Sequence, residues 1–396
     1  MGLFGQILAL PYLALCYGLW IAVNITRPLL LATILCMLVN PKAAQAKLEI
    51  IVSTFRYLVL SKDKKWKKAN DDPASFFSKD SDGELIVLRK KTVVFLRHGE
   101  STWNDTFNKG DRKMSSFVLG FIPGIFHSLA TEWYFLVRGM SDESWFFDSP
   151  LSAKGIGQAE GVARFLRETD AQYATPREAK FLSLVKGEKS EKNEAGEMCV
   201  LVSSNLRRAI STCAIAMKDR LDQKIPGDNI IILQELQEAS INPDAQSITP
   251  AFEKLVTSFT DSEAVKSIYA NQSDTSINKG NKGIKSNGLQ RMEAFCNLLF
   301  ATDGYESVKG NDGDDSNNAA TILGNANNVM CTGHSYWFRA FFQTYLPRDF
   351  QHICKTKKLV NGGLVGFTLC HTKVKETGEE KFMIDPASLT VLYAGF

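Results

Sequence analysis

Three short apolar runs that end in cationic or histidine-bearing turns constrain the fold of this chain most strongly. The runs Thr92–Leu96, Cys199–Val202 and Val329–Thr332 are rich in β-branched and other apolar residues, as expected of strands that are buried on both faces of a sheet. In α/β proteins, ligands bind beyond the carboxyl ends of such strands. We therefore expect an α/β fold with a mostly parallel sheet, helices on both of its faces, and a functional site at that edge.

The turns that follow the three runs carry the candidate chemistry. The first run is followed by Arg97-His98-Gly99-Glu100, the second by Ser203–Thr212 and the third by Gly333-His334-Ser335. A lone histidine after a strand is most often structural. An Arg-His pair before a glycine is more specific, because glycine lets other backbone approach closely.

These motifs resemble those of the histidine phosphatase superfamily, the phosphoglycerate mutase-like proteins. The first turn resembles the family's R-H-G-E tetrad, and the third resembles its second histidine turn. Ser203–Thr212 is similar to the family segment S-x-L-x-R-A-x-x-T, which aligns the phosphate-binding arginine with Arg208 rather than Arg207. Asn361-Gly362-Gly363, followed by an apolar run, looks like the strand that closes the site. The resemblance covers about residues 85–396 and implies a three-layer α/β/α sandwich.

The resemblance implies a phosphomonoester hydrolase that acts through a phosphohistidine intermediate on His98, since neutral imidazole is a good nucleophile near pH 7. Arg97 and Arg208 would fix the phosphoryl group, because a guanidinium fork meets its oxygens bidentately. His334 would donate to a third phosphate oxygen. No metal or cofactor is implied, because these groups already supply the positive charge. The remaining candidate substrate-binding residues are Asn104, Ser101 and Glu235.

A leaving alkoxide needs a proton, so a carboxylic acid is expected near His98. Glu235 and Glu238 both fit the family's L-x-E pattern. We favour Glu238, because Leu236–Ser240 followed by Asn242-Pro243-Asp244 resembles a subgroup whose acid stands in an L-Q-E-x-S turn. Either glutamate could instead cap a helix or face solvent, so the choice stays open.

Two alternatives to a phosphatase remain. The first is a phosphoglycerate mutase-type phosphotransferase, which the sequence disfavours. After Asn104 it departs from the glycolytic mutases, and Ser149–Gly155, which resembles the family's P-L-[ST]-x-x-G helix start, follows a long insertion. The second is a non-catalytic, membrane-bound sensor or scaffold for a phosphate ligand. The substrate, whether a phosphorylated small molecule, a lipid or a protein, and the oligomeric state stay open.

Composition excludes several classes of protein. A chain of 396 residues, 44% apolar and 22% charged, can bury a sizeable core and does not resemble a wholly disordered chain. Its formal net charge of +3 gives no support for a nucleic-acid binder with a basic surface. The eight cysteines are too sparse for a disulfide scaffold and form no C-x-x-C pair, so a reduced compartment is favoured.

The first 45 residues are expected to form a membrane anchor. From Ile7 to Val39 the only charged residue is Arg27, followed by Pro28, so a single kinked span and a re-entrant hairpin both remain open. Residues 46–84 are expected to be a basic juxtamembrane linker. Lysines beside an apolar segment favour the cytosolic side of a membrane. The N-x-[ST] sequon at Asn104 would carry a glycan into the proposed site, so we expect residues 85–396 to face the cytosol.

Three insertions interrupt the domain, at about 105–148, 186–197 and 302–328. The first contains an apolar stripe at helical spacing, formed by Phe121, Ile125, Leu129 and Trp133. It is interpreted as a cap over the pocket, with a second membrane contact as the alternative. The other two are expected to be solvated loops.

Overall fold

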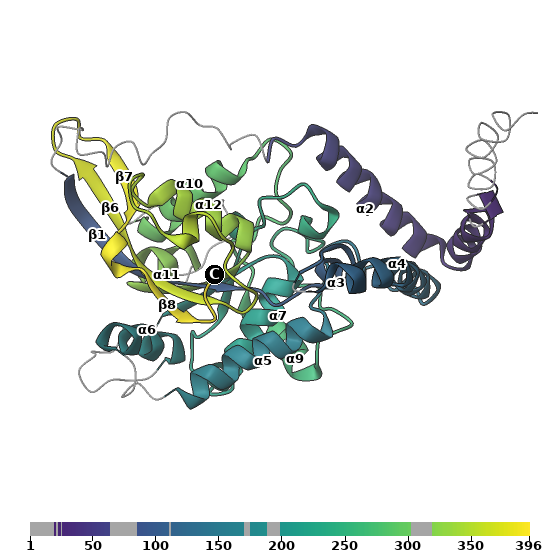
Figure 1. The fold of residues 1–396 in the computed structure, drawn as a ribbon, viewed down its shortest axis with the longest axis horizontal. Helices are drawn as coiled ribbons and strands as arrows, with labels where there is room; N and C mark the ends of the chain where they lie inside the picture. The colour runs from purple at the N-terminus through teal and green to yellow at the C-terminus, as the bar shows by residue number, and fades with distance from the viewer. Residues whose placement is uncertain are drawn as a thin grey trace, which may run out of the picture.

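The computed structural model describes residues 20, 23–24, 26–63, 85–110, 112–169, 175–187, 199–301 and 319–396. At its centre lies an eight-stranded sheet with the order β4-β3-β2-β5-β1-β6-β7, in which β8 also pairs with β6 (Figure 1). The strands are β1 (Leu85–Arg97), β2 (Val200–Ser204), β3 (Ile230–Leu233), β4 (Ser273–Asp274), β5 (Asn328–Gly333), β6 (Leu364–Val374), β7 (Glu380–Ile384) and β8 (Thr390–Tyr393).

The sheet is mostly parallel, as the sequence predicts. Four successive pairs, from β4 through β3, β2 and β5 to β1, are parallel. Strand β6 is antiparallel to β1, β7 and β8, so among the described strands only β6 runs against the others. The apolar runs Leu85–Leu88 and Thr92–Leu96 form one long strand, β1, with a register shift between Val87 and Arg89.

Successive residues of β1 pack into two separate cores, one on each face of the sheet, because side chains alternate between the faces of a strand. Val93 and Phe95 pack with α10 (Gly288–Phe300), α11 (Ala319–Asn325) and α12 (Ser335–Tyr345). Val94 and Leu96 pack on the opposite face. The helices of that second layer are α5 (Ala153–Glu168), α6 (Pro176–Lys186), α7 (Arg207–Ala216), α8 (Lys218–Leu221) and α9 (Glu263–Asn271). The three-layer α/β/α sandwich expected from the sequence is confirmed.

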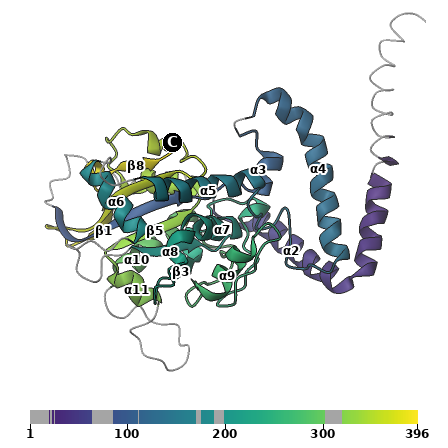
Figure 2. The same ribbon diagram turned by 90° about the horizontal axis from the view of Figure 1, so that it is seen from below.

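Three apolar helices project from the sheet domain (Figure 2): Thr26–Val39, α2 (Pro41–Leu60) and α4 (Met114–Val137). The first two lie against α4, where Trp133 Nε1 donates to Thr33 Oγ1 at 3.1 Å and Lys47 Nζ lies 2.8 Å from Glu132 Oε2. Of the described helices, α4 is the one long and apolar enough to cross a membrane, and Thr26–Val39 is a shorter apolar helix.

The expected anchor and linker are only partly covered by the structure. Residues 1–19, 21, 22 and 25 of the anchor and residues 64–84 of the linker lie outside the described residues. Within the segment interpreted as a linker, residues 46–60 belong to helix α2.

Helix α2 turns its apolar side outward. Large apolar side chains that recur at helical spacing are exposed, whereas Lys47, Thr54 and Tyr57 on the other side are buried. This is the reverse of the usual arrangement in a water-soluble protein, in which the apolar stripe of a helix faces the core. The exposed stripe consists of Leu48, Ile51, Val52, Phe55, Leu58 and Val59.

The insertions differ in how far the structure describes them. The first contains α4 and the end of α3 (Thr102–Phe107). Residues 188–197 and 302–318 of the other two lie outside the described residues. The remainder of the third is not the expected loop: Ala319–Asn325 forms α11, because Ala319 and Leu323 are apolar enough to join the core.

Candidate active site

The ends of four neighbouring strands, β3, β2, β5 and β1, deliver the predicted site residues to one edge of the sheet. Arg97 is the last residue of β1 and His98 follows it. Arg208 lies in the first turn of α7 after β2, and His334 joins β5 to α12. Glu238 follows β3 and the short 3₁₀ helix Gln234–Leu236. Parallel pairing thus gathers residues that are up to 237 positions apart in the sequence.

A cavity of about 250 Å³ lies at this edge. It contains four of the predicted residues that carry chemistry, namely Arg97, His98, Arg208 and Glu238, together with Asn104. The other lining residues are Asn108, Ala239, Ser240, Asn242, Asp244, Ser335, Tyr336 and Lys358.

The backbone around His98 is fixed on both sides. His98 N donates to Gly333 O at 3.0 Å, and Asn361 Nδ2 donates to His98 O at 2.9 Å. Gly99 packs directly on Gly155, since a Cβ on Gly99 would lie 2.3 Å from the Gly155 carbonyl oxygen. The glycine of the tetrad is therefore needed for close approach, and Gly155 is in the first turn of α5, the helix whose start the sequence predicted.

The hydrogen bonds of His98 place its proton on Nδ1 and leave Nε2 unprotonated, as an acceptor. The ring is buried, and Nδ1 lies 2.5 Å from its acceptor, Gly99 O, so Nδ1 carries the proton. Arg208 Nε donates to Nε2 at 3.4 Å. Burial, reinforced by Arg208 and Arg97, holds the pKa of His98 well below its usual value of 6.5. The imidazole is therefore neutral at pH 7, with its nucleophilic nitrogen beside a guanidinium group.

His334 lies behind His98 and does not line the cavity. The ring centroids are 4.9 Å apart, and the His334 side chain is fully buried. Its Nε2 lies 2.9 Å from Ser204 Oγ, while Nδ1 has no hydrogen-bond partner among the described residues. Burial and the charge of Arg208 also hold the pKa of His334 well below 6.5. If Ser204 donates to Nε2, the proton of the neutral ring stays on Nδ1, as a donor without an acceptor.

Two arginines, together with Lys358, supply the positive charge of the cavity. Arg97 Nη1 donates to Leu359 O at 2.6 Å. Arg208 Nη1 donates to Asp244 O at 2.5 Å, and its Nη2 lies 3.5 Å from Asp244 Oδ2. Asp244 thus orients Arg208, while burial raises the pKa of the Asp244 carboxyl.

The two candidate acids occupy different environments. Glu238 lines the cavity, and its Oε1 accepts from Trp337 N at 3.1 Å and Ala239 N at 3.0 Å. Burial raises the pKa of Glu238, and the nearby cations Arg208 and Lys282 oppose this shift. Glu235 does not line the cavity, and its Oε1 accepts from Lys279 Nζ at 3.1 Å.

Of the two predicted substrate-binding residues Asn104 and Ser101, only Asn104 lines the cavity. Asn104 lines the cavity, and its Oδ1 accepts from Asn108 Nδ2 at 2.6 Å. Ser101 is not among the lining residues. Instead its hydroxyl caps helix α3 by accepting from Asn104 N at 3.2 Å, as serine commonly does at a helix N-terminus.

Sequence reasoning missed Asp244 and Lys358. Asp244 follows the Asn242-Pro243 turn used to align Glu238, so the motif that contains it was noticed but its contact with Arg208 was not. Lys358 lines the cavity, and partial burial of its ammonium group lowers its pKa. No sequence motif marks it, since the family resemblance quoted for this region begins only at Asn361.

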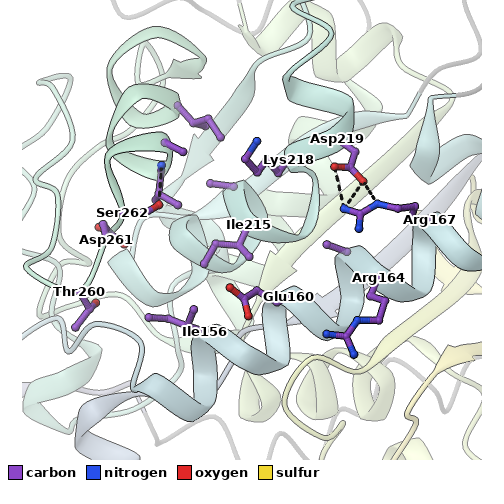
Figure 3. A pocket seen from close by; sticks show the side chains of 15 residues that line it. Ile156, Glu160, Arg164, Arg167, Ile215, Lys218, Asp219, Thr260, Asp261 and Ser262 are labelled. Carbon is purple, nitrogen blue, oxygen red and sulfur yellow. Dashed lines mark hydrogen bonds and ion pairs between the residues drawn. The ribbon is translucent and has the colours of Figure 1, made fainter.

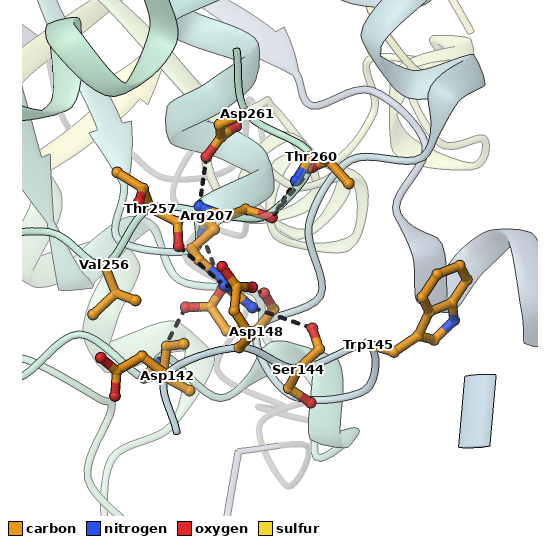
Figure 4. A network of polar contacts seen from close by, with 12 residues as sticks. Asp142, Ser144, Trp145, Asp148, Arg207, Val256, Thr257, Thr260 and Asp261 are labelled. Carbon is orange, nitrogen blue, oxygen red and sulfur yellow. Dashed lines mark hydrogen bonds and ion pairs between the residues drawn. The ribbon is translucent and has the colours of Figure 1, made fainter. Parts of the chain in front are cut away.

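Arg207, the neighbour of Arg208, has a different set of partners (Figure 4). It is fully buried, and its guanidinium group donates to Glu143 Oε2 at 3.0 Å and Asp148 O at 3.0 Å. Its backbone N donates to Asp148 Oδ1 at 2.9 Å. Arg207 therefore ties the end of the first insertion to the start of α7, the helix that carries Arg208.

A larger hollow of about 440 Å³ lies away from this edge, between α5, α7 and α9 (Figure 3). Its charged groups include Glu160, Arg164 and the ion pair of Arg167 with Asp219 at 2.8 Å. None of the predicted site residues lines it. Among the described residues, no group of three or more His, Cys, Asp or Glu side chains is arranged to hold a metal ion.

No protein-family model and no curated protein sequence matches this chain. Among solved structures, it is similar to a mycobacterial glucosyl-3-phosphoglycerate phosphatase at 14% identity, with 75% of this chain and 98% of that chain covered and a TM-score of 0.30. It is also similar to a phosphoglycerate mutase from Bacillus anthracis at 13% identity, with 75% of this chain and 93% of that chain covered and a TM-score of 0.32. Similarity at this level does not assign the chain to a family.

Proposed function

We propose that this protein is a phosphomonoester hydrolase of the histidine phosphatase superfamily, acting through a phosphohistidine intermediate on His98. One observation carries the proposal: Arg97, His98, Arg208 and Glu238 line the same cavity, in which His98 is neutral and its unprotonated Nε2 faces Arg208. A nucleophile, two phosphate-binding cations and a proton donor are the groups that this reaction needs.

The phosphate group of the substrate binds first, between the two guanidinium groups. In phosphoryl transfer, charge is spread over the three equatorial oxygens of phosphorus, and fixed donors stabilise it there. Arg97 and Arg208, which both line the cavity, supply these donors. The helix N-termini of α7 and α12, at the same edge of the sheet, add favourable dipoles for an anion.

In the first chemical step, His98 Nε2 forms a bond to phosphorus while the ester P–O bond breaks. The electron pair of that bond goes to the leaving oxygen, which takes the proton of the Glu238 carboxyl. The raised pKa of Glu238 keeps this proton available at a higher pH than an exposed glutamate would.

In the second step, water replaces the histidine. The Glu238 carboxylate removes a proton from the water as its oxygen bonds to phosphorus, and the N–P bond breaks. Inorganic phosphate leaves, His98 is again neutral and Glu238 is again protonated. The cycle therefore consumes one water molecule and needs no other reactant.

We further propose that the protein is attached to a membrane through Thr26–Val39, α2 and α4, with the cavity on the cytosolic side. Most of the large exposed apolar side chains of the described chain lie on these three helices. An apolar surface of this extent is typical of a membrane contact. Basic residues flank α4, with Arg112 and Lys113 before it and Arg138 after it, where they can reach lipid headgroups.

The test uses the full chain in detergent micelles with 4-nitrophenyl phosphate as substrate. We expect many molecules of inorganic phosphate to be released per protein molecule, and almost none from His98→Ala. The matched control is His352→Ala, since His352 lies outside the cavity and its loss should leave turnover intact. Wild-type protein that releases no phosphate, or His98→Ala that releases it at the wild-type rate, would refute the proposal.

The same reaction separates the two alternatives. A mutase-type phosphotransferase would pass the phosphoryl group to an added alcohol such as glycerol in preference to water, so glycerol phosphate would exceed inorganic phosphate. A sensor or scaffold would bind phosphate, with neither product formed.

A further inference from the structure

A buried ion cluster joins the end of helix α2 to the loop that carries Glu238. Asp63 lies just beyond α2, and its side chain is completely buried. Its Oδ2 lies 2.8 Å from Lys282 Nζ, and its Oδ1 lies 2.7 Å from Arg291 Nη1. Charges buried this deeply are tolerated only when both partners and their remaining hydrogen-bonding groups are satisfied. The other hydrogen-bond partners of Lys282 and Arg291 therefore show which part of the chain the cluster fixes.

Lys282 connects Asp63 to the backbone of the Glu238 loop. Besides Asp63, its ammonium group donates to the carbonyl oxygens of Glu238 and Ser240. Its three N–H donors thus have three acceptors, one on α2's end and two on the loop. Two further hydrogen bonds connect the loop to these cationic residues at Gln237. Its Oε1 accepts from Lys282 N at 2.9 Å, and its O accepts from Arg291 Nη2 at 3.4 Å.

Asp63 also keeps Lys282 in its charged form. Burial lowers the pKa of Lys282 to about 8, and the negative charge of Asp63 is the largest effect that opposes this shift. An ammonium group donates stronger hydrogen bonds to carbonyl oxygens than a neutral amine does. The ring of Tyr57, on α2, lies 5.1 Å from Lys282 Nζ and adds a cation–π contact from the same helix.

We propose that Asp63 is a positioning residue for the proton donor. Through Lys282 it fixes the loop 237–240 relative to the end of helix α2, and so holds the Glu238 carboxyl in place. This inference rests on the proposed function, since it requires Glu238 to protonate the leaving group. A misplacement of about 1 Å can cost about 10²-fold in rate, so a backbone hold of this kind has a measurable effect on catalysis.

The test compares two substrates in the full chain in detergent micelles. Glycerol 2-phosphate has an alkoxide leaving group that needs a proton, whereas 4-nitrophenyl phosphate has a leaving group that needs little protonation. We expect Asp63→Asn to lower kcat for glycerol 2-phosphate about tenfold or more beyond any loss with 4-nitrophenyl phosphate. A merely structural role would lower both rates by the same factor.

A second variant keeps the test decisive if Asp63→Asn folds poorly. Lys282→Met leaves Asp63 paired with Arg291 but removes the ammonium group that joins Asp63 to Glu238 and Ser240, so it should give the same selective loss. The matched control is Asp228→Asn, which breaks another buried ion pair, with Arg220 at 2.6 Å. Asp228 is absent from both the cavity and the Lys282 cluster, so the ratio of the two rates should not change.

A second measurement does not depend on turnover. Hydrogen–deuterium exchange at residues 237–240, which include the Ala239 amide bonded to Glu238, should be faster in Asp63→Asn and Lys282→Met than in the wild type. It should be unchanged in Asp228→Asn. Either of two results overturns the inference alone. The first is unchanged exchange in both test variants. The second is that both variants turn over at the wild-type rate with an unchanged ratio of the rates for the two substrates. Wild-type protein that releases no phosphate from either substrate overturns the proposed function instead.

Discussion

At the scale of single residues, burial and one guanidinium group together keep both histidines neutral. Arg208 lies against His98 Nε2, and its charge adds to burial in lowering the pKa of His98 and of His334. A cation beside an imidazole disfavours imidazolium. The arginine that binds the phosphate in the proposed reaction therefore also keeps the nucleophile unprotonated before the substrate arrives.

We predict that His98 stays neutral when the pH falls through the range in which an exposed histidine titrates. The sign follows from the lowered pKa: protonation occurs only at a pH well below 6.5. The measurement is an NMR titration of the substrate-free protein with labelled histidine, in which the five histidine signals are assigned with single variants. A titration midpoint for His98 near 6.5 would contradict the prediction.

The choice between the two acids can also be tested at this scale. We predict that Glu238→Gln lowers kcat for glycerol 2-phosphate by roughly 10²–10⁴-fold, the usual contribution of a general acid. The loss with 4-nitrophenyl phosphate should be much smaller. Glu235→Gln is the matched control, because Glu235 is paired with Lys279 outside the cavity. A larger loss in Glu235→Gln than in Glu238→Gln would reverse the assignment.

Single residues were predictable from the sequence where a strand presents them. Arg97, His98 and Arg208 meet because each directly follows a buried strand, and neighbouring parallel strands end at one edge. The role of Ser101 was not predictable, because a serine beside a signature motif can equally well cap a helix. Asp244 was also missed, since its contact with Arg208 depends on the path of the loop after β3.

At the scale of elements, the helices outside the sandwich differ most from expectation. The stripe Phe121, Ile125, Leu129 and Trp133 was interpreted as a cap over the pocket. In the structure these side chains are half-buried, and Trp133 contacts Thr33. No residue of α4 lines the cavity. Periodicity gives the inner face of a helix but not its partner, so the packing of α4 on another apolar helix could not be predicted.

We predict that charges on the outer face of α4 weaken membrane binding. Leu119 and Ile122 are 78% and 57% exposed, and a charged side chain at such a position is costly within a bilayer. In a chain without residues 1–39, Leu119→Glu together with Ile122→Glu should reduce co-sedimentation with vesicles containing anionic lipid by about tenfold or more. Ile353→Glu, at a 40% exposed position on the sheet domain, is the control. Equal binding of all three proteins would rule out α4 as a membrane contact.

At the scale of the whole molecule, part of the segment interpreted as a linker contacts the sheet domain. Residues 46–84 were interpreted as a basic juxtamembrane linker, because eight basic residues face two acidic ones between Lys42 and Lys68. Yet Asp63 from this stretch is buried against Lys282, 219 positions later in the chain. A single acidic residue among lysines gives no signal in the sequence, and only the fold brings its two cationic partners to it.

This arrangement predicts that two truncations differ in stability. Removal of residues 1–39 leaves α2 and Asp63 in place, beginning at the helix cap Asn40. Removal of residues 1–69 leaves Lys282 and Arg291 buried without their carboxylate, which costs about 3–5 kcal/mol. Thermal unfolding in the same detergent, followed by circular dichroism, should therefore give a clearly lower Tm for the shorter protein. Equal Tm values would mean that the Asp63 cluster contributes nothing to folding.

The most direct test of the proposed chemistry is to locate the phosphoryl group on the protein during turnover. Full-length protein is mixed with ³²P-labelled substrate, quenched in base within the first turnover, digested and mapped by mass spectrometry. Since Nδ1 of His98 donates to Gly99 O and Nε2 faces Arg208, the label should be acid-labile, base-stable and on Nε2 of His98. Label on Nδ1, label on another residue, or turnover with no labelled protein at all would contradict nucleophilic attack by His98.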